Sequence, residues 1–279
     1  MTKRLTLILF TLFPLLTVNA QTTYTKDDST EVVTLLKDAQ PSTLYYARKL
    51  LGRPYVAHTL EVNDNEQLII NMRQLDCTTL VETVTALTLC AMKGKQTFAD
   101  YVNMLTLLRY RKGEVNEYPS RLHYFSDWIL DKQKMGIVSE LQSPNPPFSA
   151  VQKLNLNYMS THPQSYKALT AHPEWITIIE NQEKELTGSR FYYIPKDKVR
   201  NTRLLRSTIQ DGDIIAITCS KKGLDIAHLG FAVWKSDGLH LLNASQLHKK
   251  VVLEPMTLGT YLSKHPTHTG IRVIRINNK

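Results

Sequence analysis

The sequence predicts an α+β fold built on an antiparallel sheet. Up to about Gly212 the hydrophobic residues recur with a helical period, and after it short segments rich in branched residues are separated by polar turns. Helices followed by a run of strands are typical of α+β proteins, whereas parallel α/β proteins alternate the two. The 279 residues correspond to about two domains, or to one domain with large insertions.

Six segments of the first part have helical periodicity, and several of them end near a glycine, as helices often do. They are residues 32–36, 44–51, 80–91, 98–110, 124–133 and 173–186. Five segments of the second part are typical of strands. They are residues 213–219, 228–234, 239–245, 251–253 and 271–276. The proline-rich residues 144–147 indicate a loop or a boundary.

The composition is that of a globular protein, with 42% hydrophobic and 21% charged residues. The formal net charge of +9 suits an anionic partner, but the basic residues are dispersed and no nucleic-acid-binding motif is present. We therefore expect no nucleic acid partner. A solvated basic surface explains the charge, and attraction toward an acidic envelope polymer is the alternative.

Residues 1–20 are typical of a signal peptide. Lys3 and Arg4 precede an apolar run over residues 5–16, and the small residues 18–20 suit a cleavage site. The run is shorter than a membrane-spanning helix, and no later segment is long enough to span a bilayer. We expect a mature chain of residues 21–279 in a periplasmic or extracellular space.

Several enzyme classes are excluded by missing motifs. The chain has no glycine-rich phosphate loop, no Gly-x-Ser-x-Gly elbow and no His-Glu-x-x-His zinc motif. His265 and His268 are three residues apart, but no third ligand lies near them, so we interpret them as part of a solvated loop. No metal and no cofactor is expected. The three cysteines cannot form a disulfide framework, so any cysteine chemistry depends on one thiol.

Cys77 is the candidate nucleophile because it lies at the predicted start of an amphipathic helix. Free N–H groups and the positive end of the helix dipole favour a thiolate there. Asp76 precedes it, and a carboxylate beside the sulfur opposes ionisation unless it turns away to cap the helix. The alternative is a buried structural cysteine, a role that suits Cys90 and Cys219 better.

His228 is the candidate base. On an alternating strand it shares a face with Gly230 and points away from the bulky apolar side. A four-residue turn over residues 235–238 places Trp234 opposite Leu239 and brings Asn243 within one diagonal step of His228. Asn243 is therefore the candidate for orienting the imidazole, and Ser245 and His240 are its rivals.

Five segments together resemble the NlpC-type cell-wall cysteine hydrolases, which are papain-like enzymes, and in particular their N-acetylmuramoyl-L-alanine amidase-like branch with an extra helical domain. These segments are residues 52–55, Asp76-Cys77, residues 118–128, residues 223–230 and residues 270–273. The resemblance covers nearly all of residues 51–275. It differs from the wider family after Asp-Cys, where Thr78-Thr79-Leu80 replaces Ser-Gly-Phe, and at Asn243, where a histidine is common.

The resemblance implies a single papain-like catalytic domain over residues 21–279. Its core is an antiparallel sheet packed on the nucleophile helix, with a helical insertion at about residues 95–205. Cys77 matches the nucleophile, His228 the base, Asn243 the third polar residue and Tyr55 a tyrosine beside the site.

A polar and aromatic stretch is the candidate substrate wall of such a site. It comprises Ser120, Arg121, His123, Tyr124 and Trp128. Aromatic faces take the carbons of a sugar while polar ends bind its hydroxyl groups. A helix-entry loop is the alternative explanation of the stretch.

The resulting hypothesis is a peptidoglycan hydrolase that cleaves the N-acetylmuramoyl-L-alanine amide bond of muropeptides through a thioester. One alternative is an endopeptidase that cuts after D-glutamate, for which Asp127 is the candidate carboxylate that receives a free amine. A second is a non-catalytic module that binds the cell wall, and a third is a cysteine acyltransferase that acts on lipids. The expected partner is peptidoglycan or its fragments, and the sequence does not indicate an oligomeric state.

Overall fold

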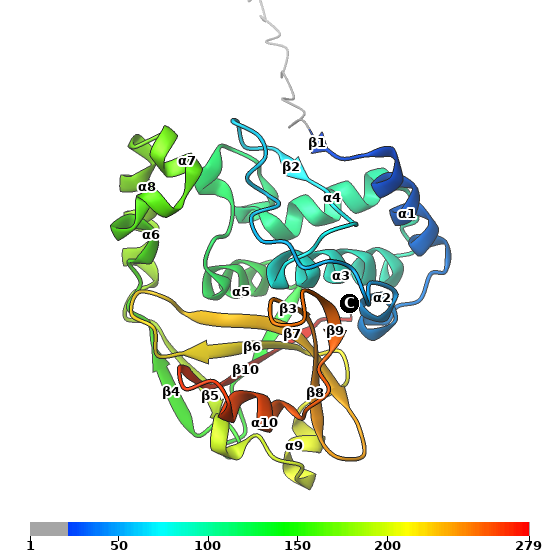
Figure 1. Cartoon of the computed structure of the whole chain (residues 1–279), viewed down its shortest axis with the longest axis vertical. Helices are drawn as coiled ribbons and strands as arrows, with labels where there is room; N and C mark the ends of the chain where they lie inside the picture. Colours follow the sequence, from blue (N-terminus) through cyan, green and yellow to red (C-terminus); the bar gives the residue numbers. More distant parts are fainter. Residues whose placement is uncertain (1–21, 279) are drawn as a thin grey trace, which may run out of the picture.

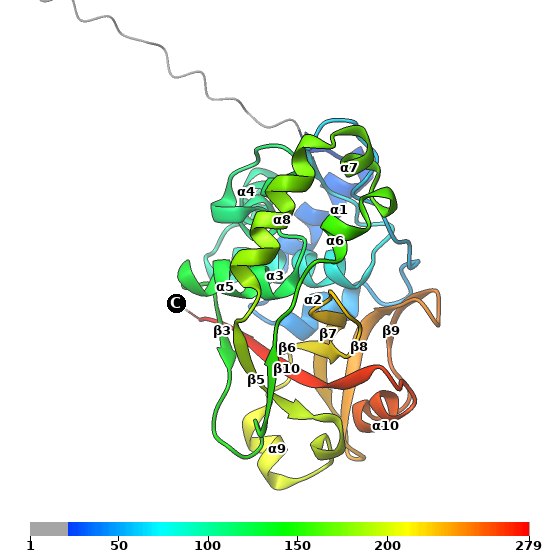
Figure 2. The same ribbon diagram turned by 90° about the vertical axis from the view of Figure 1, so that its left-hand side faces the viewer.

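A computed structural model describes residues 22–278 of the chain. The expected signal peptide, residues 1–20, lies outside the described residues. In Figure 1 the helices α1, α3, α4 and α5 lie above the main sheet, and α9 and α10 lie below it. Figure 2 shows α6, α7 and α8 together on one side, above the edge of the sheet.

The main sheet contains eight strands within residues 22–278 and is antiparallel at every pairing. Its order is β4 (Ala150–Lys153), β5 (Arg190–Pro195), β10 (His268–Ile276), β6 (Ile214–Cys219), β7 (Ile226–Trp234), β8 (Leu239–Ser245) and β9 (Lys250–Leu253), and β3 (Val138–Leu141) pairs with β10. The short strands β1 (Thr22–Thr23) and β2 (Leu68–Ile69) pair apart from it. The prediction of an α+β fold with an antiparallel sheet is confirmed.

The helices come mostly before the central strands. They are α1 (Lys26–Lys37), α2 (Thr43–Lys49), α3 (Cys77–Met92), α4 (Phe98–Arg109), α5 (Phe125–Lys134), α6 (Tyr158–Thr161), α7 (Lys167–Ala171), α8 (Glu174–Leu186), α9 (Arg203–Thr208) and α10 (Leu258–Ser263). The six helices and five strands predicted from periodicity are all present. Residues 95–205, expected to hold a helical insertion, carry α4 to α9 and also the strands β3, β4 and β5, which join the main sheet.

Both faces of the sheet are covered. One face packs on α1 to α5 in the largest hydrophobic core, where Leu229, Phe231 and Val233 of β7 take part. The other face packs on α10 and the chain before β6, and Ala232 of β7 lies there. A third core lies within α6 to α8 and includes Tyr124. The expected division of β7 into two faces is therefore confirmed.

A buried polar network fixes the start of α5 against the start of β7. The Asp225 carboxylate accepts hydrogen bonds from the backbone N–H groups of Ser126 at 2.6 Å and Ile226 at 2.8 Å. The fully buried Arg272 donates from Nη1 to Ser126 Oγ at 2.7 Å and from Nη2 to Glu140 at 3.1 Å. Buried charges need partners of this kind, and this set joins α5 to the three strands β7, β10 and β3.

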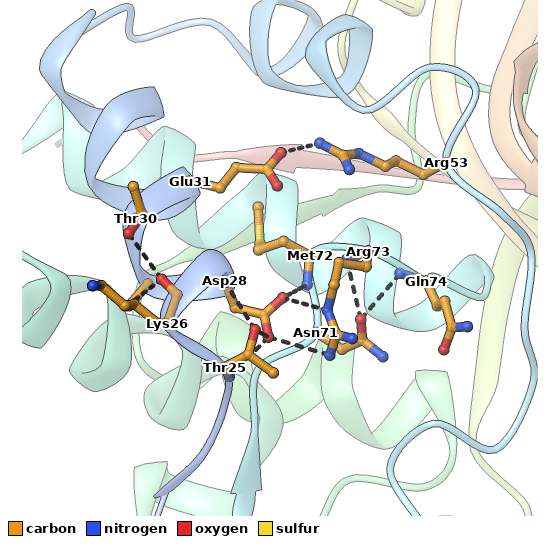
Figure 3. Close-up of polar contacts among 11 residues, drawn as sticks. Thr25, Lys26, Asp28, Thr30, Glu31, Arg53, Asn71, Met72, Arg73 and Gln74 are labelled. Atoms are coloured by element: carbon orange, nitrogen blue, oxygen red, sulfur yellow. Dashed lines mark hydrogen bonds and ion pairs between the residues drawn. The ribbon is translucent and has the colours of Figure 1, made fainter.

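A second buried carboxylate anchors α1 to the segment that leads into α3 (Figure 3). Asp28 accepts from the backbone N–H of Met72 at 2.8 Å and from Arg73 Nε at 3.2 Å, and it completes the capping box of Thr25. Burial alone would raise the pKa of the Asp28 carboxyl, but the hydrogen bonds outweigh burial and hold its pKa below the usual value. The charged form is therefore the one that stabilises this junction.

We expect Asp28→Ala to lower the free energy of unfolding by about 3 kcal/mol, because it removes a helix cap and leaves the Met72 N–H unpaired. The difference from the wild type should shrink as the pH falls through the folded-state pKa, since protonation then removes the same contribution from the wild type. Chemical denaturation at several pH values measures this. Asp27→Ala, on the exposed side of the same turn, is the control and should cost less than about 1 kcal/mol. Equal losses in the two variants would contradict the account.

Candidate active site

Cys77 is the first residue of α3, and Asp76 is the N-cap. The Asp76 carboxylate accepts from the Thr79 N–H at 2.8 Å, and Thr79 Oγ1 accepts from the Asp76 N–H at 2.9 Å. This capping box ends the chain's extended run and starts the helix at the cysteine. The carboxylate is therefore engaged in capping, as its position before the helix predicts.

The sulfur faces a pocket of about 180 Å³ between α3, α5, α6 and the start of β7. Residues on the rim come from parts of the chain that are far apart in sequence. They are Cys77, Thr78, His123, Tyr124, Phe125, Met159, Tyr166, Leu224, Asp225, Ile226, Ala227, His228 and Leu229. Figure 1 shows α3, α5 and α6 above the main sheet, and the lining residues come partly from these helices and from the start of β7.

The pKa of the Cys77 thiol is raised to about 12 by burial and by the Asp76 charge. The Leu229 backbone and the Thr78 hydroxyl, which hydrogen-bond the thiol, act in the opposite direction but do not compensate. The expectation that the helix start alone favours a thiolate is therefore wrong for the resting site. Attack by this sulfur requires a base that removes its proton.

His228 lies on the same pocket and hydrogen-bonds to Asn243, with 2.9 Å between Nε2 and Oδ1. Asn243 is buried, and its Nδ2 donates to the Leu241 carbonyl at 3.3 Å, which orients Oδ1 toward the imidazole. This arrangement assigns the ring proton to Nε2 and leaves Nδ1 as the basic nitrogen.

The strand register brings these two side chains together. Trp234 pairs with Leu239 as the turn length predicts, and Gly230 lies between His228 and the buried part of β7. A Cβ atom at Gly230 would lie 2.7 Å from the Leu242 carbonyl oxygen and 2.8 Å from the Leu241 side chain. Only glycine therefore fits where β7 approaches β8 beside the imidazole.

Ser245 and His240, the other two candidates for orienting His228, form hydrogen bonds with other groups. Ser245 Oγ accepts from the His248 N–H at 3.2 Å. His240 is fully buried and hydrogen-bonds to the Glu254 carbonyl and to Asp237. Asn243 is the one of the three that the structure joins to His228.

The pKa of His228 is lowered, chiefly by burial and also by the charge of His265, while Asn243, Asp76 and Glu254 act in the opposite direction. The directions of the two pKa shifts favour a neutral imidazole and a neutral thiol at this pocket. This combination suits general-base catalysis, in which the proton moves as the sulfur attacks.

Tyr55 packs near Cys77 at the edge of the largest core. Its backbone forms a β-bridge with Leu75, and its N–H donates a hydrogen bond to the Lys249 carbonyl at 2.9 Å. Burial raises the pKa of its phenol to about 12, with further contributions from Cys77 and Asp76. The hydroxyl group thus stays protonated and remains a hydrogen-bond donor near the sulfur.

Two of the five residues predicted as a substrate wall line the pocket. His123 Nε2 lies 3.0 Å from the Tyr118 carbonyl oxygen, and burial with the charge of Arg121 lowers the pKa of His123 to about 3. Tyr124 donates from its hydroxyl to Glu183 at 2.6 Å. Both residues present ring surface to the pocket while their polar ends are held by the protein.

The other three do not reach the pocket. Trp128 is 1% exposed and stacks on Phe125 in the largest core. Arg121 is buried in ion pairs with Glu61 and Glu66, and Ser120 donates from its hydroxyl to the Glu117 carbonyl away from the site. Arg121 and Ser120 stabilise the turn before α5 and Trp128 packs in the core, so none of the three lines this pocket.

Met159, Tyr166 and Leu224 line the pocket but were not predicted. Met159 belongs to α6 and Tyr166 precedes α7, more than 80 residues after Cys77. Their periodicity indicates no special role, and only the folding of α6 to α8 over the sheet brings them to the thiol. Leu224 lies in the segment of residues 223–230 that carries part of the family resemblance, so the sequence did offer a signal there.

His268 is not part of a solvated loop. It is 7% exposed and stacks on His265 with 4.6 Å between ring centroids. The interpretation of this pair as solvated is therefore wrong, because α10 covers one side of it.

The geometry agrees with what comparison with known proteins shows. The family model of AmiA-like proteins, described as N-acetylmuramoyl-L-alanine amidase-like, matches residues 45–271. The chain belongs to this AmiA-like family. A comparison with curated proteins found no match.

Solved structures of similar proteins extend the likeness. An N-acetylmuramoyl-L-alanine amidase from Bacteroides uniformis is 39% identical, with a TM-score of 0.79 over 88% of this chain and 99% of that one. A Bacteroides fragilis protein described as a candidate xylanase is 40% identical, with a TM-score of 0.78 over 84% and 100%. A Legionella pneumophila protein of the DUF1460 family, 23% identical with a TM-score of 0.69 over 90% and 95%, shares the fold.

Within residues 22–278 of this AmiA-like chain, no helix is both long and apolar enough to cross a membrane.

We expect Asn243→Ala in this AmiA-like protein to lower kcat/KM about 10- to 100-fold and His228→Ala to lower it at least about a thousandfold. The first loses the group that holds the imidazole, whereas the second loses the base itself. Steady-state kinetics on a muropeptide measure both. Ser245→Ala is the control and should stay within about threefold of the wild type. A larger loss in Ser245→Ala than in Asn243→Ala would move the orienting role to Ser245.

We also expect His228→Ala to slow alkylation of Cys77 by iodoacetamide near pH 7 at least about tenfold, because the thiol needs the imidazole to lose its proton. Peptide mass spectrometry gives the rate at each cysteine. Cys219, which is partly exposed, is the internal control and should react equally in both proteins. Unchanged labelling of Cys77 would show that its reactivity does not depend on His228.

Proposed function

We propose that the protein is a peptidoglycan amidase that cleaves the amide between the lactyl group of N-acetylmuramic acid and L-alanine, with Cys77 as nucleophile. The observation that carries the proposal is the meeting of Cys77 with the hydrogen-bonded His228–Asn243 pair at one pocket. The chain belongs to an amidase-like family, and this supports an amide as the substrate of the cysteine–histidine pair.

The proposed reaction proceeds in two steps. His228 takes the proton of Cys77 as the sulfur attacks the lactyl carbonyl, so a C–S bond forms and a negative charge develops on the oxygen. His228 then gives the proton to the nitrogen of L-alanine, the C–N bond breaks and the peptide leaves with a free amine. Water hydrolyses the remaining thioester, with His228 again as base, and restores the thiol.

Donors for the developing oxyanion come from the nucleophile's own surroundings. The backbone N–H of Cys77, the first residue of α3, has no acceptor within the helix, and the helix dipole favours negative charge there. The protonated Tyr55 phenol, close enough to feel the charge of Cys77, is the candidate second donor. Fixed donors of this kind stabilise a charge that appears only in the transition state.

We also propose that the core is papain-like. A cysteine at the start of a helix, a histidine and an asparagine on neighbouring antiparallel strands, and helix–sheet packing between them support this assignment. The residue roles are those of the papain-type triad, in which an asparagine orients the imidazole.

The pocket favours the amidase over the endopeptidase. Asp127, the carboxylate considered for a free amine, is paired with Arg111 at 2.6 Å and does not line the pocket. Asp225 is the one carboxylate among the lining residues, and both its oxygens accept backbone N–H groups. The aromatic surfaces of Tyr124 and Tyr166 suit the face of a sugar ring on the acyl side.

The likeness to a candidate xylanase does not suggest a glycosidase here. Glycosidases usually place two carboxyl groups about 5 to 10 Å apart around the bond. Among the residues that line this pocket, Asp225 is alone, and it caps the start of α5.

We propose export to the periplasm or the exterior, where peptidoglycan is found. The support is the signal-like pattern of residues 1–20.

Digestion of a disaccharide tetrapeptide, followed by mass analysis, tests the function. The expected products are the free tetrapeptide and the peptide-less disaccharide. Cys77→Ala should lower the rate at least about a thousandfold with an unchanged circular dichroism spectrum. A disaccharide that keeps L-alanine and D-glutamate would indicate the endopeptidase. Binding without cleavage by the wild type would indicate a cell-wall-binding module.

A further inference from the structure

A buried carboxylate that takes no part in the proposed reaction contacts two residues of the pocket. Glu183 belongs to α8, is 1% exposed and is not among the residues that line the pocket. Its Oε1 accepts a hydrogen bond from the Tyr124 hydroxyl at 2.6 Å and from the Met159 backbone N–H at 3.0 Å. The Ser160 N–H donates to the same oxygen at 3.3 Å. Tyr124 and Met159 both line the pocket.

The Glu183 carboxylate caps α6 from a different helix. The first turn of a helix leaves backbone N–H groups without partners inside the helix. Asn157, the N-cap of α6, makes no side-chain hydrogen bond to these groups. Glu183, which is 24 residues after Met159, accepts from two of them instead. Because the Met159 N–H also donates to the Tyr124 hydroxyl at 3.2 Å, one contact joins α8, the start of α6 and the residue before α5.

The first turn of α6 is also held by the segment that leads to the candidate base. The Tyr158 N–H donates to the Gly223 carbonyl at 3.3 Å, and Leu156 forms a β-bridge with Gly223. Gly223 has a φ of +79°, and a Cβ atom there would lie 2.6 Å from Asn157 Oδ1, so this approach requires glycine. Figure 2 shows α6 beside α8. The start of α6 therefore contacts both Glu183 and the segment that enters β7.

Loss of the Glu183 acceptor would affect the pocket wall but not the reacting groups. Hydrogen bonds to a charged acceptor are stronger than those to a neutral one, and a buried donor without a partner is costly. Without Glu183, the Tyr124 hydroxyl and the two N–H groups of α6 would have to move to find other acceptors. Cys77 and His228 have separate supports, which are the capping box of α3 and the hydrogen bond to Asn243.

We propose that Glu183 is a positioning residue that fixes the part of the pocket wall formed by Tyr124 and Met159 and thereby sets how tightly the substrate binds. The inference rests on the proposed amidase function for the identity of that substrate. Glu183 contacts neither the thiol nor the imidazole, and it acts through the hydroxyl of Tyr124 and the backbone of α6. It should therefore affect KM and leave kcat nearly unchanged.

Two variants of similar size that differ in the acceptor test this role. Glu183→Leu removes the acceptor, whereas Glu183→Gln keeps a carbonyl oxygen that can accept the same hydrogen bonds. With a disaccharide tetrapeptide as substrate, Glu183→Leu should raise KM at least about tenfold and keep kcat within about threefold of the wild type. Glu183→Gln should keep KM within about threefold. Glu185→Leu, at an exposed position of the same helix, is the matched control and should leave both constants unchanged.

Two further measurements separate positioning from general damage to the fold. Iodoacetamide is small and does not need the wall, so it should alkylate Cys77 in Glu183→Leu at a rate within about twofold of the wild type. Tyr124→Phe keeps the ring and removes only the donor, and it should raise KM at least about threefold. Adding Tyr124→Phe to Glu183→Leu should raise KM no further, because the two residues act as one unit.

An unchanged KM in Glu183→Leu would overturn the positioning role. Equal increases of KM in Glu183→Leu and Glu183→Gln would also overturn it, and so would a joint loss of kcat and of Cys77 alkylation. If Glu183→Leu does not fold, an unchanged KM in Tyr124→Phe overturns the role by itself.

Calorimetry separates failure of this inference from failure of the proposed reaction. In the Cys77→Ala protein, adding Glu183→Leu should weaken binding of the intact disaccharide tetrapeptide at least about tenfold, and adding Glu183→Gln should not. That result supports the positioning role even if the wild type cleaves no muropeptide. Cleavage by the wild type together with equal binding by all three Cys77→Ala proteins keeps the amidase and removes the role of Glu183.

Discussion

The contact between the start of α3 and the start of β7 is the constraint on which the candidate site depends. It puts a cysteine at a helix terminus against the backbone of Leu229, one residue after the candidate base. The Asp76 capping box fixes the first end of this contact, and the Asp225 hydrogen bonds to α5 and β7 fix the second. Asp28 holds the chain that enters α3. Three carboxylates, none of them in a proposed chemical step, therefore determine where the thiol and the imidazole meet.

Burial and the nearby charges favour the neutral form of both candidate reacting groups. Burial and Asp76 raise the pKa of Cys77, whereas burial and His265 lower the pKa of His228. In a site of this kind the thiolate and the imidazolium form only during attack. Fixed hydrogen-bond donors near the sulfur then stabilise the negative charge that develops on the substrate oxygen. Such a site also keeps the thiol in its less reactive protonated form until a substrate arrives.

Short-range patterns predicted the elements that carry the chemistry. The apolar stripe after Cys77 located a helix start, and strict alternation with a four-residue turn was enough to bring Asn243 to His228. The substrate wall could not be predicted in the same way. Trp128 and Arg121 have the residue types of a sugar site, but whether such a side chain faces a pocket or the core depends on what packs over it. Met159 and Tyr166 reach the pocket only through the tertiary placement of α6 and α7. The strands β3 and β4 have only four residues each, and β5 begins with Arg190 and ends with Pro195, so none of them stands out as a strand in the sequence.

The central claim is that Cys77 carries the acyl group of a muramic acid during turnover. Acid quenching of the wild-type protein during reaction with a disaccharide tetrapeptide, followed by intact-protein and peptide mass spectrometry, tests it most directly. The account predicts an adduct that consists of the disaccharide acyl group alone and lies on the peptide that contains Cys77. Neutral hydroxylamine should remove this adduct, as it removes thioesters. An adduct that also carries L-alanine and D-glutamate, or an adduct on any other residue, would contradict it.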